Sequence, residues 1–260
     1  FTPPSQGDRN SAHRGPVFLP WHRHMLILLE YQLQRVLGDD DFGLPYWDWA
    51  ADGDLTRPQQ LASPIWGAQW MGGTGNPVTT GPFAFNAGDP QTWQVRLVSN
   101  SNGQLVSVNR GLRRGLAMPP PVGVRTLPTT PQVGQALLIS TYDSSPWNTS
   151  TADFRNRLEG WQPLANAPGL HNRVHVWVGG DMSPCSSPND PVFYLNHCNV
   201  DRIWAAWQAP RRIDSYLPDM TAPAALLGHR IDDDMYALLS DPVTPRQMLD
   251  VSDIYSYDTL

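Results

Sequence analysis

The stretch LHNRVHVW, residues 170–177, decides the fold. Its histidines, His171 and His175, are four residues apart, so a helix would carry both imidazoles one above the other on a single face. Imidazole is the commonest metal ligand among side chains. The stretch therefore predicts a helix that binds one metal ion through two histidines one turn apart.

A second histidine-bearing helix is predicted further along the chain. Asn189 or Asp190 offers an N-cap and Pro191 the first helical position, so the helix carries His197 about two turns from its start. An apolar stripe points this histidine toward the core and consists of Phe193, Val200 and Trp204.

The N-terminal histidines follow the same logic. Residues 21–37 show the apolar spacing of an amphipathic helix, headed by His22 and ended by Gly38. His24 faces another side of this helix and is not counted as a ligand.

A less specific interpretation competes with metal binding. A single buried histidine on an apolar helix face is more often a hydrogen-bonded core residue than a ligand. The pair at 171 and 175 favours metal, because two adjacent buried imidazoles need partners that a hydrocarbon core lacks. His229 has no such setting and is expected at the surface.

Several long motifs occur in order along nearly the whole chain: AHRGPVFLPWHR at 12–23, LPYWDW at 44–49, LEGW at 158–161, HNRVH at 171–175 and NDPVFYLNH at 189–197. Together they resemble the bacterial tyrosinases of the type 3 copper family. The segment IYSYD, residues 254–258, is similar to the Tyr-x-Tyr element that closes the core domain in many relatives.

The resemblance implies a mainly α fold, with a four-helix bundle core that holds a dicopper centre, long loops and a little β structure. It implies two copper ions, each bound by three histidines, with dioxygen as co-substrate. Carried over by motif, His13 and His22 are ligands of the first copper, and His171, His175 and His197 of the second. All-imidazole sites suit copper, although a single three-histidine site would also suit zinc.

The sequence departs from the family at the first copper. The family has a third histidine ahead of the position of His13, and this chain has none there. Phe1 opens without a methionine, so the N-terminus is interpreted as truncated. Two smaller departures are Asn196 before His197, where relatives often carry a second histidine, and Ser11, where some relatives carry a cysteine bonded to the ligand, so no thioether is expected at His13.

Two further residues are predicted to be catalytic. In resembling enzymes the residues that match Glu159 and Asn172 hold a water that helps to take the proton from a phenol, whose pKa is near ~10. The ordinary alternatives are a salt bridge for Glu159 and a solvated helix position for Asn172. Asp201 is expected either to orient an imidazole or to pair with Arg173 or Arg202.

Composition and length limit the possible partners and the domain organisation. The chain has 260 residues, a net charge of −6 and no apolar run long enough for a membrane span, so neither nucleic acid nor a membrane is expected as a partner. We predict one domain over residues 1–260, in which residues 52–150 form a loop-rich insertion with short β pieces. Cys185 and Cys198 are compatible with a disulfide or with two buried thiols, and the compartment is not given.

The predicted function is a dicopper oxidase that uses dioxygen to convert phenols and o-diphenols to o-quinones. A small phenolic substrate and a copper-delivering helper protein are the expected partners. Three alternatives stay open: an o-aminophenol oxidase with the same metal site, a haemocyanin-like oxygen-binding protein, and a catalytically inactive remnant, which the missing ligand suggests.

Overall fold

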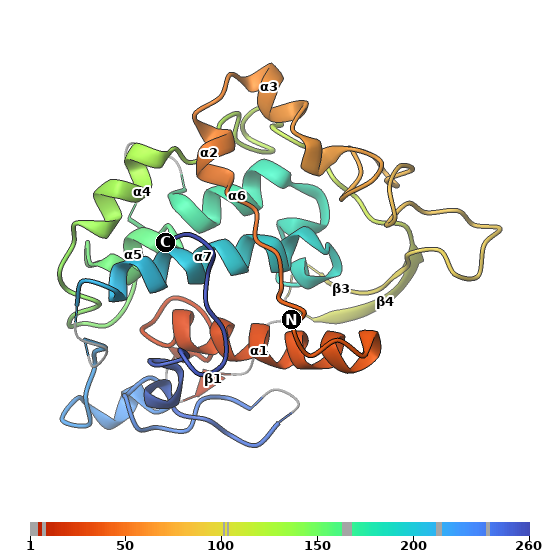
Figure 1. Ribbon diagram of the computed structural model, residues 1–260. Coiled ribbons are helices and arrows are strands. Elements are labelled where there is room, and N and C mark those ends of the chain that lie inside the picture. Colours follow the sequence, from red (N-terminus) through yellow and green to blue (C-terminus); the bar gives the residue numbers. More distant parts are fainter. Residues whose placement is uncertain are drawn as a thin grey trace. The chain divides into compact units, whose positions relative to one another are not determined.

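The computed structural model is mainly helical, with two small two-stranded sheets (Figure 1). It describes residues 5–6, 9–100, 102, 104–162, 168–211, 215–237 and 240–260. The strands are β1 (Ser5–Gln6), β2 (Arg9–Asn10), β3 (Val95–Ser99) and β4 (Leu105–Arg110). The helices are α1 (Phe18–Leu37), α2 (Trp49–Gly53), α3 (Arg57–Leu61), α4 (Thr130–Leu137), α5 (Phe154–Glu159), α6 (Leu170–Val178) and α7 (Val192–Gln208). Short 3-10 helices lie between them at η1 (Pro64–Trp66), η2 (Gly180–Met182) and η3 (Ser187–Asn189), and after α7 at η4 (Ala224–Leu226) and η5 (Pro245–Met248).

The chain divides into two compact units. One contains Trp47–Thr130 and Leu170–Asn196, and the other contains the N-terminal segment through Tyr46, Pro131–Gly169 and His197–Leu260. The boundary after Asn196 falls inside α7, which is one continuous helix. No helix among the described residues is long and apolar enough to cross a membrane.

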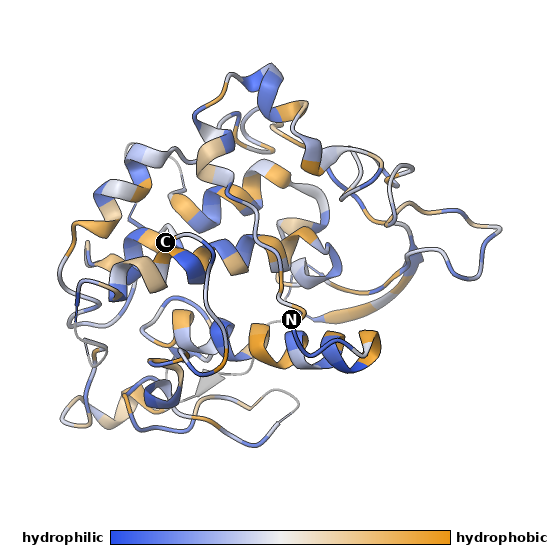
Figure 2. Cartoon of the chain, viewed as in Figure 1, coloured by the Kyte–Doolittle hydropathy of each residue, from blue (hydrophilic) through white to orange (hydrophobic). Residues whose placement is uncertain are grey.

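Helix α1 confirms the predicted histidine helix but begins earlier. It starts at Phe18 rather than after Pro20, because a proline in the first helical turn lacks only an N–H that would have no partner there. Gly38 ends the helix in the left-handed conformation, with φ of 66°. Apolar and polar residues alternate along α1 (Figure 2), and its N-terminal half, which includes His22, is buried.

The two helices that carry the second histidine group, α6 and α7, form where the sequence predicts, and α7 begins at Val192, one residue after the predicted first position. Helix α5 ends at Gly160, which has φ of 103°, and α6 spans the histidine pair. At the start of α7, the Asp190 carboxylate accepts the Val192 N–H over 3.1 Å. Local capping and spacing are therefore sufficient to place these elements.

The two short β pieces predicted in residues 52–150 form strands β3 and β4, which pair antiparallel. Beneath them lies a small buried cluster of Val78, Val95 and Leu112. In the same unit, Arg114 donates two hydrogen bonds to Asp190, and both side chains are fully buried. This ion pair ties the insertion to the start of α7. One domain for the whole chain stays a prediction.

Within the second unit, a buried polar cluster joins the C-terminal tail to α1 and α7. The Asp201 carboxylate on α7 accepts hydrogen bonds from Arg23 Nε, over 2.6 Å, and from the hydroxyls of Tyr255 and Tyr257. The prediction that Asp201 pairs with Arg173 or Arg202 is wrong, because its carboxylate is already engaged by these three groups. The Tyr-x-Tyr segment thus serves to anchor the tail.

Candidate metal centre

The pair on α6 has the geometry expected of two ligands of one ion. His171 Nε2 lies 2.9 Å from His175 Nε2. His175 Nδ1 donates to the Met182 carbonyl over 2.7 Å, and His171 Nδ1 lies 3.1 Å from the Asn172 side-chain oxygen. Each helix position therefore aims Nε2 of its ring at the other.

These hydrogen bonds fix the tautomers. The Met182 carbonyl can only accept, so His175 carries its proton on Nδ1 and a lone pair on Nε2; with the Asn172 oxygen as acceptor, His171 has the same tautomer. Two lone pairs at 2.9 Å repel one another unless a cation lies between them. Burial lowers the pKa of His175 to about 4, which favours the neutral imidazole that metal ligation requires. The donor set therefore fits a metal ion.

His197 completes a group of three. One ring nitrogen from each of His171, His175 and His197 lies within 4.8 Å of the others. His197 is 1% exposed, His171 is 2% exposed, and His175 is half-buried. Three imidazoles are the ligand set that both copper and zinc accept.

The first group contains two of the predicted ligands. His13 and His22 have ring centroids 4.8 Å apart, and His22 stacks on His197 with centroids 4.3 Å apart. His22 Nδ1 donates to the Phe18 carbonyl over 2.7 Å, which leaves the lone pair on Nε2. Within the described part of the chain, no second group of three potential ligands assembles around His13 and His22.

His24 is engaged by a different residue. Its Nε2 lies 2.9 Å from the Ser240 hydroxyl, and burial lowers its pKa. His229, in contrast, was expected at the surface, and that prediction is wrong. It is fully buried against Gly15, and its Nδ1 accepts the Val17 N–H over 3.4 Å.

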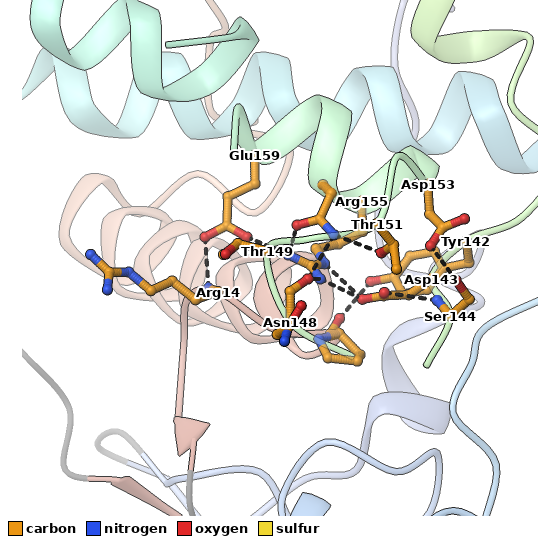
Figure 3. A network of polar contacts seen from close by, with 12 residues as sticks. Arg14, Tyr142, Asp143, Ser144, Asn148, Thr149, Thr151, Asp153, Arg155 and Glu159 are labelled. Carbon is orange, nitrogen blue, oxygen red and sulfur yellow. Dashed lines mark hydrogen bonds and ion pairs between the residues drawn. The ribbon is translucent and has the colours of Figure 1, made fainter. Parts of the chain in front are cut away.

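Glu159 is fully buried at the end of α5 and belongs to an extended polar network (Figure 3). One carboxylate oxygen accepts the backbone N–H of Arg14 over 2.8 Å, and the other accepts from Arg155 over 2.9 Å. Burial raises the pKa of Glu159, and the positive charge of Arg155 opposes that shift. The carboxyl is thus a stronger base than an exposed glutamate.

Arg155 is the residue of this network that sequence reasoning missed. It is fully buried and forms a second ion pair with Asp143 at 2.7 Å. Desolvation raises the pKa of Asp143 to about 6, opposed by Arg155. The only local signal is the i, i+4 spacing of Arg155 and Glu159, which an exposed helix pair would share.

The cysteines near the second group are not joined by a disulfide. Cys185 is exposed and Cys198 is buried. Burial raises the pKa of the Cys198 thiol well above its usual value, so it stays protonated.

The chain is similar to known copper enzymes over most of its length. A family model described as "Common central domain of tyrosinase" matches residues 2–210. The tyrosinase of Streptomyces antibioticus is 41% identical, over 86% of this chain and 80% of that protein. The tyrosinase of Streptomyces glaucescens is 39% identical, over 97% and 82%, and the grixazone synthase of Streptomyces griseus is 37% identical, over 95% and 81%.

Proposed function

This chain belongs to the tyrosinase family of copper oxidoreductases, and we propose that it uses dioxygen to oxidise phenols and o-diphenols to o-quinones at a dicopper centre. The observation that carries the proposal is the pair of Nε2 lone pairs held 2.9 Å apart by His171 and His175. The family match favours this enzyme over a haemocyanin-like oxygen-binding protein.

We propose His171, His175 and His197 as ligands of the second copper, and His13 and His22 as ligands of the first. Copper, when bound, would supply the redox chemistry. The protein would supply neutral imidazoles in fixed tautomers. The balance needs no other oxidant. Two o-diphenols lose four electrons and four protons in all, and one dioxygen takes them up as two waters; one phenol and one dioxygen give one o-quinone and one water.

The catalytic assignment of Glu159 and Asn172 is part of the proposal. A phenol must lose a proton before its oxygen binds copper well, and a buried carboxyl of raised pKa is suited to take it. The Asn172 oxygen has a second task, because it accepts from His171 Nδ1 and so fixes the orientation of that ring. A phenolic substrate and a copper-delivering helper protein are the proposed partners.

The test is metal content together with turnover. We expect two coppers per chain and conversion of a catechol, with tyrosine and an o-aminophenol assayed side by side. Faster turnover of the o-aminophenol than of tyrosine and the catechol would favour the o-aminophenol oxidase over the phenol oxidase. One zinc per chain with no turnover of any of the three would reject the proposal.

A matched pair of variants on α1 sharpens the test. His22→Ala removes a proposed ligand, and His24→Ala removes a histidine that lies two positions on and contacts Ser240 instead. We expect His22→Ala to lose copper from the first site and His24→Ala to keep two coppers. Equal copper loss in both variants would contradict the assignment.

A further inference from the structure

Residues 11–17, here called the His13 loop, have an irregular backbone between β2 and α1, yet most of them are buried. Arg14 has φ of 60°, a left-handed conformation that costs a non-glycine residue free energy. A buried backbone without regular structure must find its hydrogen bonds elsewhere. Something other than the loop itself must therefore hold this conformation.

Three buried side chains from distant segments meet the loop. Glu159 accepts the Arg14 N–H over 2.8 Å, as Figure 3 shows, and Tyr142 donates to the Pro16 carbonyl over 2.6 Å. His229 accepts the Val17 N–H. Within the loop's own neighbourhood, the Asn10 side chain accepts the backbone N–H groups of residues 12 and 13.

The contact of His229 is the most specific of the three. A Cβ atom added at Gly15 would lie 2.8 Å from Cε1 and 2.9 Å from Nδ1 of the His229 ring. The residue is fully buried, which leaves its ring little room to move, and the Tyr216 hydroxyl holds its backbone carbonyl over 2.7 Å. Burial also lowers the pKa of His229 to about 4, so the ring is neutral and Nδ1 can accept.

We propose that His229 is a positioning residue for His13: its ring fills the space left by the missing side chain of Gly15 and locks the His13 loop in place. The proposal rests on the proposed function in one respect, namely that His13 binds copper. His229 itself touches neither substrate nor metal in this proposal. It acts through the backbone of residues 15–17.

The sharpest test changes each side of the contact between Gly15 and His229, separately and together. Gly15→Ala adds a methyl group where the ring lies, and His229→Ala removes the ring. We expect each single variant to weaken copper binding at the first site by about tenfold or more, as loss of a supporting residue does at other metal sites. In the double variant the added methyl occupies part of the vacated space, so we expect binding closer to wild type than in Gly15→Ala alone.

A second readout needs no metal. Hydrogen exchange of the Arg14 amide in the copper-free protein should be faster in both single variants and closer to wild type in the double variant, whereas the Val17 amide should stay fast wherever His229, its acceptor, is absent. Gly134→Ala on α4 is the matched control, because a Cβ there would meet nothing within 4 Å. It should change neither exchange in the loop nor copper binding.

The outcomes separate the two proposals. Exchange and copper affinity that are unchanged in His229→Ala, or strictly additive effects in the double variant, would overturn the positioning role. If His229→Ala fails to fold, Gly15→Ala still tests the contact from the loop side. A wild-type protein that binds no copper would reject the proposed function, whereas amide exchange would still decide whether His229 holds the loop.

Discussion

The backbone of α6 satisfies its own hydrogen bonds, whereas the backbone of the His13 loop depends on side chains from residues 142, 159 and 229. In α6, helical spacing alone brings His171 and His175 together. In the loop, the position of His13 depends on packing between segments more than a hundred residues apart. The histidine pair of α6 is thus held by local structure, and His13 by tertiary structure.

The largest expected effect comes from removing a ligand in α6. His175→Ala should lose the second copper, and its rate of catechol oxidation should fall by more than about 100-fold. Loss of a residue that only supports a ligand already lowers metal affinity or activity by about 10–100-fold. Alanine favours helix, so α6 should persist and thermal unfolding of the copper-free protein should change little. Metal analysis and unfolding curves test both parts. A variant that keeps two coppers would show that His175 is not a ligand.

The ion network behind the His13 loop should make folding stability depend on pH. Burial raises the folded-state pKa of Asp143 to about 6, so the folded protein keeps a proton that the unfolded chain releases near pH 4. This group therefore favours folding below pH ~4, and that contribution is lost as pH rises to about 6. Relative to Asp143→Asn, the wild type should lose up to ~3 kcal/mol of unfolding free energy across this window.

Denaturant unfolding of both proteins between pH 4 and pH 7 measures the effect. Asparagine keeps an oxygen that can accept from Arg155 but does not titrate. A stability difference that is constant across the window would show that Asp143 titrates normally. That result would contradict the raised pKa of Asp143 in the folded protein.

Loss of the side chain that orients the His171 ring is expected to lower catechol turnover less than loss of a ligand. Asn172→Ala removes the acceptor of His171 Nδ1 and should lower catechol turnover about 10–100-fold. Asn172→Asp retains an acceptor oxygen and should keep more of the activity. A greater loss with tyrosine than with catechol would support the proposed part of Asn172 in phenol deprotonation, and equal losses would limit it to orienting the ring.

The same contrast explains what the sequence could predict. Residues 21–37 and 170–177 form helices as expected, and so does the predicted segment around His197, because caps, apolar spacing and Gly38 act within a few residues. The buried position of His229 and the partner of Asp201 were predicted wrongly. Each depends on a contact with a distant segment, Gly15 in one case and Arg23 in the other, that no local pattern encodes.

The smallest expected effect compares glycine with alanine at one position in each region. At Arg14, where φ is 60°, Arg14→Gly should be more stable than Arg14→Ala by ~1–2 kcal/mol, because alanine resists the left-handed conformation. At Arg173, inside α6, Arg173→Ala should instead be more stable than Arg173→Gly by ~0.8–1 kcal/mol. Both members of each pair lose the same arginine contacts, with Trp161 in one case and Thr126 in the other, so the differences report on the backbone. Thermal unfolding of the four variants gives the sign at each position. If alanine were the more stable variant at both positions, Arg14 would not be held in the left-handed conformation. The contrast between a helix that satisfies its own backbone and a loop held by distant side chains would then not extend to this residue.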